Sequence, residues 1–200
     1  MTLGIVLAGG QGVRLARPEH KAMVMLAGRS LLTRARETLA RLCDEVLVSA
    51  PAAFELDVPR SGRVADPEGS GGPLAGLVQS LAARPYSLAV VLAVDLPFAN
   101  SAALCALQAH LQPGDDAVMA APGGIPQPLA AWYAPGAVTR LAAVFASGER
   151  SVTRAVLGLR VRVVDPAVLA TMPGGESSYF NLNTPADLAA AERRLREGAE

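Results

Sequence analysis

GIVLAGGQGVRL, residues 4–15, begins as a short apolar strand and runs directly into a glycine-rich loop. Gly9, Gly10 and Gly12 leave the backbone of this loop without Cβ atoms, so its N–H groups can approach a ligand closely. Alternatively, the glycines only form a tight turn from a strand to a helix. Two cations, Arg14 and Lys21, follow within one short loop, and they favour a loop that binds an anionic ligand.

Two familiar phosphate-binding motifs do not fit this loop. The sequence has no GxxxxGK[ST] pattern, and a GxGxxG register that starts at Gly10 meets Leu15 where the third small residue belongs. A kinase-like or dehydrogenase function therefore loses most of its support.

Short runs rich in Val, Ile and Leu alternate with longer segments rich in Ala, Leu and Arg, which predicts an α/β protein with a parallel sheet covered by helices. The run at 88–94 is apolar throughout, which suits a central strand buried on both faces. Gly72-Pro73 and Thr184-Pro-Ala-Asp187 are signals for helix starts. We expect strands at 3–7, 45–48, 87–94, 117–121, 130–133 and 160–164, and helices at 30–42, 73–83, 101–111, 137–146, 152–157 and 185–196.

The composition suits a single domain over residues 1–200, because 51% of the 200 residues are hydrophobic and can form a substantial core. Eighteen basic and eighteen acidic residues cancel, so no broad positive field would attract nucleic acid or an anionic membrane. Cys43 and Cys105 have no CxxC spacing, which argues against disulfides or zinc. With no signal peptide or membrane span in evidence, we expect a cytoplasmic protein.

Further motifs follow the loop in a fixed order: Lys21, Asp66, Gly72-Pro-Leu-Ala-Gly76, Val94-Asp-Leu-Pro97 and Asn181-Leu-Asn-Thr-Pro185. Together with the loop, this ordered set resembles the molybdenum cofactor guanylyltransferases, which build the guanine dinucleotide form of molybdopterin. The resemblance runs from Gly4 to about Leu188. It implies a single domain with the Rossmann-like three-layer α/β/α nucleotidyltransferase fold, a mostly parallel central sheet, dependence on Mg²⁺, and GTP as the nucleotide.

The resemblance also implies roles for individual residues. The catalytic groups would be Lys21 and Arg14 as cations and Asp95 as the Mg²⁺ ligand, while Asn181 and Asn183 would lie on the acceptor and metal side. The nucleotide-binding residues would be Leu7, Ala8, Gly9, Gly10, Gly12, Lys21, Asp66, Gly72 and Pro73. One departure concerns the loop, because the family usually has Asp-Lys where this chain has His20-Lys21, and the role of His20 stays open.

Nucleotidyl transfer needs charge cancellation and alignment more than it needs a general base. The attacking phosphate monoester has a second pKa of about 6 and is already mostly ionised near neutral pH. Asp95 follows a very apolar strand, where a carboxylate is costly unless it is paired or bound to a cation. The alternatives are that Asp95 caps the turn before Pro97, that Asp66 makes an Asx turn, and that the two asparagines serve only as cap and turn residues.

Several functions remain open at this point. The acceptor is expected to be molybdopterin, with transient contacts to other proteins of molybdenum cofactor biosynthesis, but a cytidylyltransferase for the same cofactor and a transferase acting on a sugar phosphate or another small acceptor are alternatives. The first loop and the Asn181-Leu-Asn183 element favour guanine over cytosine. A nucleotide-binding partner protein without catalysis is disfavoured by the presence of both Lys21 and Asp95.

Overall fold

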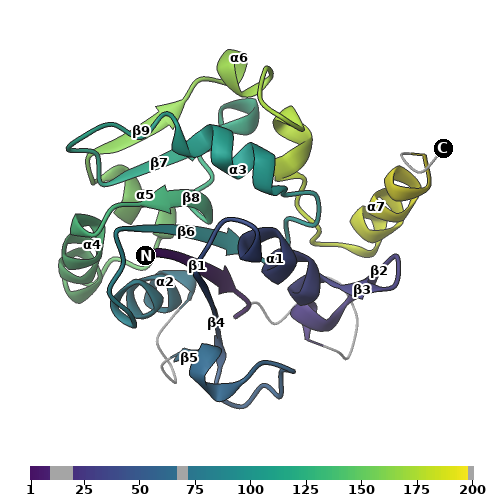
Figure 1. Cartoon of the computed structure of the whole chain (residues 1–200), viewed down its shortest axis with the longest axis horizontal. Coiled ribbons are helices and arrows are strands. Elements are labelled where there is room, and N and C mark those ends of the chain that lie inside the picture. Colours follow the sequence, from purple (N-terminus) through teal and green to yellow (C-terminus); the bar gives the residue numbers. More distant parts are fainter. Residues whose placement is uncertain (10–19, 67–71, 198–200) are drawn as a thin grey trace.

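The computed structural model describes residues 1–9, 20–66 and 72–197 and has a central sheet of seven strands in the order β5-β4-β1-β6-β8-β7-β9 (Figure 1). β8 is antiparallel to its neighbours β6 and β7, whereas the other pairs of this sheet are parallel. β6 is the fourth strand of the seven, which confirms the central position predicted for the run at 88–94. The strands are β1 (Thr2–Leu7), β4 (Glu45–Pro51), β5 (Arg63–Asp66), β6 (Leu88–Ala93), β7 (Ala117–Ala120), β8 (Ala130–Tyr133) and β9 (Val161–Val164).

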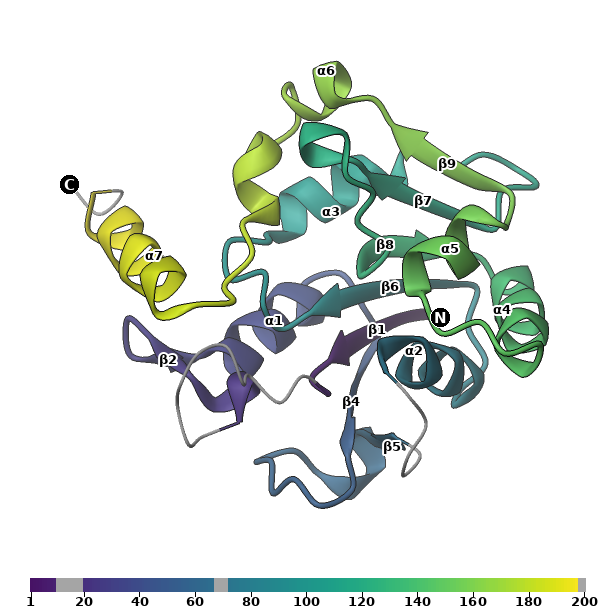
Figure 2. The same cartoon turned by 180° about the vertical axis from the view of Figure 1, so that it is seen from behind.

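Helices cover both faces of the sheet. α1 (Leu31–Ala40) and α3 (Ser101–Gln108) lie on the face turned towards the viewer in Figure 1, while α2 (Pro73–Ala82), α4 (Gly136–Ala146) and α5 (Val152–Leu157) lie on the other face, which is seen in Figure 2. This three-layer α/β/α arrangement with a mostly parallel sheet confirms the predicted fold class. α6 (Pro166–Leu169) and α7 (Pro185–Glu197) complete the α-helices of the described ranges.

β1 shows how the sheet serves two cores. Leu3, Ile5 and Leu7 belong to the core beneath α2, α4 and α5, whereas Val6 and Ala8 belong to the core beneath α1 and α3. This is the alternation of side chains expected along a strand buried on both faces.

Gly4 explains how closely α1 packs on β1. A Cβ atom added at Gly4 would lie 3.1 Å from Cys43 Sγ and 3.2 Å from Leu39 Cβ, which is tighter than an ordinary van der Waals contact. The glycine therefore lets the end of α1 approach the strand backbone.

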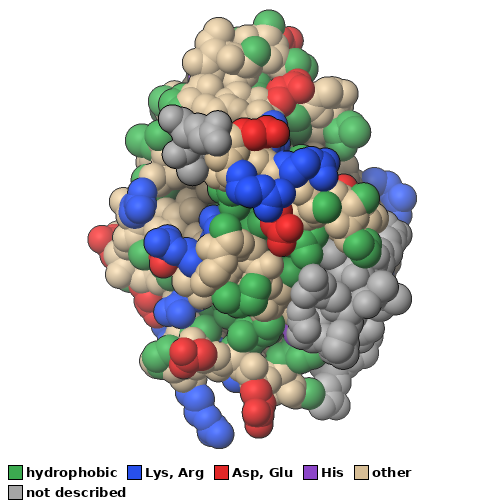
Figure 3. Space-filling model, turned by 90° about the vertical axis from the view of Figure 1, so that its right-hand side faces the viewer, with side chains coloured by type: hydrophobic (Ala, Val, Ile, Leu, Met, Phe, Trp, Pro, Cys, Tyr) green, Lys and Arg blue, Asp and Glu red, His purple; other side chains and the backbone are tan. Residues whose placement is uncertain are grey.

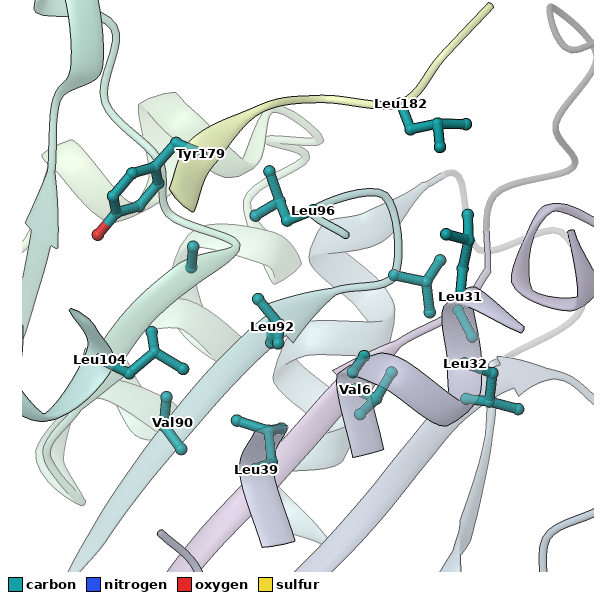
Figure 4. Packing of buried hydrophobic residues seen from close by; sticks show 14 of the residues in the cluster. Val6, Leu31, Leu32, Leu39, Val90, Leu92, Leu96, Leu104, Tyr179 and Leu182 are labelled. Atoms are coloured by element: carbon teal, nitrogen blue, oxygen red, sulfur yellow. The ribbon is translucent and has the colours of Figure 1, made fainter. Parts of the chain in front are cut away.

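The C-terminal segment contributes to the core on the α1 and α3 side. Tyr179 and Leu182 are buried in the same cluster as Leu92, Leu96 and Leu104, although they lie far apart in the sequence (Figure 4). The polypeptide thus returns to the carboxyl end of β6 before it enters α7.

Both predicted helix-start signals are confirmed. Gly72 is the N-cap of α2 with a φ of 111°, and Pro73 is the first helical residue, where its missing N–H costs nothing. At the start of α7, Thr184 Oγ1 accepts from the Asp187 N–H at 3.2 Å, while Asp187 Oδ2 accepts from the Thr184 N–H at 2.7 Å. This reciprocal pair has the geometry of a capping box.

Some short elements were not predicted. β5 has four residues, and the hairpin of β2 (Met25–Leu26) and β3 (Arg29–Ser30) has two residues in each strand, so neither gives a clear alternation in the sequence. The helices predicted at 30–42 and 101–111 are shorter in the structure, ending at Ala40 and Gln108. In the described part of the chain, no helix is long and apolar enough to cross a membrane.

Candidate active site

Three segments that are distant in the sequence meet beyond the carboxyl end of β6. They are the short 3₁₀ helix η2 (Lys21–Met23), the turn at Asp95, and the segment between η5 (Gly175–Tyr179) and α7. Figure 3 shows the molecule from the side towards which β1 and β6 point, with Lys and Arg side chains gathered above the centre of this face and hydrophobic side chains below them. In open α/β sheets, ligands bind at this edge.

Lys21 connects the three segments. Its Nζ donates to Asp95 Oδ2 at 2.9 Å and to Asn183 Oδ1 at 2.6 Å. Lys21 is 7% exposed, whereas the Asp95 side chain is 25% exposed. A buried ammonium requires such partners, because burial without them would cost several kcal/mol. Lys21 is also the only lysine of the chain, in which the remaining 17 of the 18 basic residues are arginines.

His20, the residue before Lys21, is held by a hydrogen bond and by a ring contact with Phe54. His20 is the N-cap of η2, and its Nδ1 accepts from the Ala22 N–H at 3.3 Å. Its ring packs on Phe54 with 3.7 Å between the ring centroids. Burial lowers the pKa of His20, which favours the neutral imidazole that can accept at Nδ1. The structure thus gives His20 a role in shaping the turn that carries Lys21.

Asn183 is held by the capping box of α7. Asp187 Oδ2 accepts from the Asn183 N–H at 2.9 Å as well as from Thr184, which fixes the backbone on which the asparagine side chain stands. These backbone hydrogen bonds, first that from Asn183, hold the pKa of Asp187 below its usual value, and the charge of Lys21 adds to the effect. The sequence marks Asp187 only as part of a helix-start signal, and its contact with the Asn183 backbone was not predicted.

The turn at Asp95 is tied to its neighbours through the backbone. The Val94 N–H donates to the Leu7 carbonyl at 3.2 Å, and the Asp95 carbonyl accepts from the Leu182 N–H at 2.8 Å. Phe98, three residues further on, packs edge-on against Phe180 with 5.6 Å between centroids.

Arg194 of α7 lies over the aromatic pair of Phe98 and Phe180. Its guanidinium carbon is 5.2 Å from the Phe98 centroid and 5.5 Å from that of Phe180, and its Nη2 donates to Ser177 Oγ at 2.8 Å. Arg194 is exposed, yet these contacts attach α7 to the segment after Asp95 and to the segment that leads to Asn183.

The oxygens around Lys21 Nζ suit a divalent cation. One carboxylate oxygen and one amide oxygen converge on a single ammonium, which marks a position where a cation is favoured, and both are oxygen ligands that Mg²⁺ accepts. Within the described residues no group of three or more His, Cys, Asp and Glu side chains could hold a metal. A Mg²⁺ ion at Asp95 would accordingly complete its shell with water and substrate phosphates, as Mg²⁺ usually does.

The other expected site residues occupy separate positions. Asn181 is exposed, and its Nδ2 donates to the Tyr179 carbonyl at 3.2 Å, so it does not join the contact with Lys21. Asp66 ends β5, at the edge of the sheet, where it pairs in register with Pro51 of β4. Gly72 and Pro73 begin α2 and are exposed.

The first loop is described only as far as Gly9. Leu7 and Ala8 are buried at the end of β1, and the Ala8 N–H donates to the Ser49 carbonyl at 2.8 Å. The expected contacts of Gly10, Gly12 and Arg14 lie outside the described residues.

Trp132 and Tyr133 belong to the two cores of the sheet. Both are almost fully buried in β8, where Trp132 Nε1 donates to the Leu104 carbonyl at 2.7 Å and the Tyr133 hydroxyl donates to the Pro128 carbonyl at 2.6 Å. These bonds satisfy both polar groups inside the protein, as buried polar groups require.

Known proteins that are similar to this chain belong to one class of enzyme. A family model described as the MobA-like NTP transferase domain matches residues 4–163. "Probable molybdenum cofactor guanylyltransferase" of Chloroflexus aggregans is 34% identical, covering 98% of this chain and 95% of its own length. The molybdenum cofactor guanylyltransferase of Rhodobacter capsulatus is 35% identical, with 98% of this chain and 97% of that protein covered.

A solved structure shows the same likeness in three dimensions. Molybdopterin-guanine dinucleotide biosynthesis protein A of Archaeoglobus fulgidus superposes with a TM-score of 0.79 and 26% identity, covering 98% of this chain and all of that one. The fold and the comparisons together define a nucleotidyltransferase. More closely, the chain belongs to the MobA-like NTP transferase family.

Proposed function

We propose that this chain is a Mg²⁺-dependent molybdenum cofactor guanylyltransferase, which transfers GMP from GTP to the molybdenum-loaded molybdopterin and releases pyrophosphate. The observation that carries the proposal is the convergence of Lys21, Asp95 and Asn183 at the carboxyl end of the sheet. The family and the names of its relatives support the choice of nucleotide and acceptor.

The reaction is an in-line displacement at phosphorus. A phosphate oxygen of the acceptor attacks the α-phosphorus of GTP, the bond to the bridging oxygen breaks, and pyrophosphate leaves with that oxygen. Because the acceptor phosphate is already ionised near neutral pH, no side chain has to remove a proton. The protein must instead hold the two anions in line and balance their charge.

Each residue of the site has a part in this scheme. Lys21 would contact the triphosphate, because its ammonium is a compact cation on a flexible stem. Asp95, assisted by the Asn183 oxygen, would hold Mg²⁺, which supplies positive charge beside the phosphate oxygens when bound. Arg14 would add a second cation, the backbone from Leu7 to Gly10 would contact the guanine, and Asn181 would lie on the acceptor side.

The proposal extends to partners and location. The substrates are two soluble anions, GTP and molybdopterin, and the finished cofactor would pass to other proteins of molybdenum cofactor biosynthesis through transient contacts. We propose that this takes place in the cytoplasm, without nucleic acid or membrane as a partner.

The decisive experiment measures pyrophosphate release by the purified protein with Mg²⁺ and molybdopterin, with GTP, CTP and ATP tested in parallel. We expect release with GTP and much slower release with the other two nucleotides. Release with CTP alone would identify a cytidylyltransferase. Release with GTP only when a sugar phosphate replaces molybdopterin would identify a different acceptor, and no release with any combination would reject an enzymatic function.

A further inference from the structure

The described structure has an ammonium where the proposed reaction requires a metal ion. Lys21 Nζ is within hydrogen-bond distance of both oxygens expected to face Mg²⁺, at 2.9 Å from Asp95 Oδ2 and 2.6 Å from Asn183 Oδ1. Mg²⁺ takes oxygen ligands, so an ion bound here would need the same two oxygens that the ammonium now contacts. Two cations that share these oxygens also repel each other.

We propose that Lys21 and the divalent cation compete for Asp95 and Asn183, and that a nucleoside triphosphate decides the competition by drawing the ammonium to its phosphates. The inference rests on the proposed function for the identity of the ligand. The binding of metal and of nucleotide would then be coupled. The Asp95 site binds a divalent cation strongly only together with a triphosphate, and in the nucleotide-free protein Lys21 occupies the site.

The type of residue supports this exchange. A lysine ammonium is a compact charge that can rest between two oxygens and then turn towards a third, whereas an arginine fork prefers one planar, bidentate partner. The chain uses arginine for all 17 of its other basic residues and lysine only here. The lysine stem is buried with 7% of the residue exposed, while 25% of the Asp95 side chain is open to solvent, so an incoming ligand can reach the carboxylate.

Negatively charged groups around Lys21 hold the ammonium in place until another anion, such as a triphosphate, can bind it. Asp187, whose pKa is lowered partly by the charge of Lys21, adds a second carboxylate to the neighbourhood of the ammonium. Lys21 would lose the direct bond to Asp95 on leaving, and the phosphates of a nucleotide would replace that bond with charge-assisted ones. By thermodynamic reciprocity, the nucleotide must raise the affinity for the metal by the same factor as the metal raises the affinity for the nucleotide.

The first test measures Mn²⁺ binding to the whole protein without nucleotide by electron paramagnetic resonance. We expect weak binding in the wild type and at least ~10-fold tighter binding in Lys21→Met, which removes the competing charge. Lys21→Met combined with Asp95→Asn should lose this gain. Arg29→Met, which removes an exposed cation paired with Glu37, serves as the control for net charge and should leave Mn²⁺ affinity unchanged.

A second measurement follows the Lys21 ammonium directly by NMR. It uses the wild-type protein, so it does not require that a variant folds. Because Lys21 is the only lysine, protein labelled with ¹⁵N-lysine has one side-chain ammonium resonance in its NMR spectrum. GTP without metal should shift this resonance, and Mg²⁺ without nucleotide should not. A wild-type protein that binds Mn²⁺ equally well with and without nucleotide, or a Lys21→Met variant without any gain in affinity, would overturn the proposal.

These outcomes are separate from those of the proposed function. If CTP shifts the lysine resonance and GTP does not, the guanylyl assignment fails while the competition stands. If GMP transfer occurs but Mn²⁺ binds the nucleotide-free wild type tightly, the competition fails while the guanylyltransferase stands.

Discussion

The backbone N–H of Leu182 donates to the carbonyl of Asp95 at 2.8 Å, and this bond ties the C-terminal segment to the turn at the end of the central strand. The Leu182 side chain is fully buried in the same core cluster as Leu96. The positions of Asn183 and Asp95 are thus linked through one backbone hydrogen bond and one buried side chain.

This link predicts that Leu182→Ala damages stability and activity together. Removing a fully buried leucine side chain costs about 2–5 kcal/mol through lost burial and the cavity left behind. The segment before α7 would then shift against Asp95, so kcat should fall even at temperatures where the variant is folded. Urea unfolding and pyrophosphate release check the two effects. Leu157→Ala is the control, since Leu157 is 44% exposed, and an equal loss in that variant would contradict the explanation.

Asp95→Asn is expected to abolish turnover at a moderate cost in stability. The new amide can still accept a hydrogen bond from Lys21, but the substitution removes the negative charge that balances the ammonium. Lys21 is only 7% exposed and depends on that charge. A lost charge-assisted partner costs roughly 1.5–3 kcal/mol. Pyrophosphate release and thermal unfolding measure the two consequences. Near wild-type turnover with Mg²⁺ would reject Asp95 as the metal ligand.

Lys21→Ala should lower kcat/KM by at least ~10-fold, because one charge-assisted phosphate contact contributes roughly 1.5–3 kcal/mol to the transition state. The measurement is the rate of GMP transfer at low GTP concentration. The variant should stay folded, because the freed Asp95 side chain is 25% exposed and remains in contact with water. A fall in kcat/KM would then report lost catalysis and not unfolding. An unchanged kcat/KM would move the catalytic cation to Arg14.

The fold could be predicted from sequence because its signals are local. The apolar run at 88–94, the proline at the start of α2 and the capping residues of α7 each occupy a few consecutive residues, and all three are confirmed. β5 and the β2–β3 hairpin were not predicted, because two to four residues are too few to establish an alternation of polar and apolar residues.

The site was predictable as a set of residue types, but its contacts were not. The motifs marked Lys21, Asp95 and Asn183 separately, yet nothing local in the sequence shows that one ammonium bridges the other two. The role of Asp187 was also not predicted. Its position in a helix-start signal explained the residue fully, so nothing in the sequence indicated its hydrogen bond with the Asn183 backbone. Such contacts depend on how three distant segments fold together.

Asp187→Asn should make stability less dependent on pH in the acid range. The pKa of Asp187 lies below its usual value of 3.8 in the folded protein, so its contribution is complete above that value and is lost as the pH falls through the folded pKa. The variant should therefore be less stable than the wild type at pH 7, by about 0.3–1 kcal/mol for a negative charge lost from the first turn of a helix, and the gap should narrow as the pH falls below about 4. Urea unfolding from pH 7 to pH 3 gives the comparison, with Asp165→Asn, at the cap of the short α6, as the control. A gap that is constant over this range would show that the carboxylate charge is not involved.

GTP should bind better than ATP or CTP, because in the proposed site the backbone from Leu7 to Gly10 would offer the base a fixed set of donors and acceptors. The Ala8 N–H already donates to the Ser49 carbonyl, so this donor is engaged within the sheet. Adenine reverses the hydrogen-bond polarity at position six of the purine and lacks the two-amino group, so each mismatched backbone group would cost about 1–3 kcal/mol. Taking ~1.4 kcal/mol per decade, discrimination should be ten-fold or greater, and CTP should bind more weakly still if the pocket has the size of a purine. Competition binding with the three nucleotides in Mg²⁺ measures this order. Equal affinities would reject the guanylyl assignment and leave a nucleotidyltransferase whose base is chosen elsewhere.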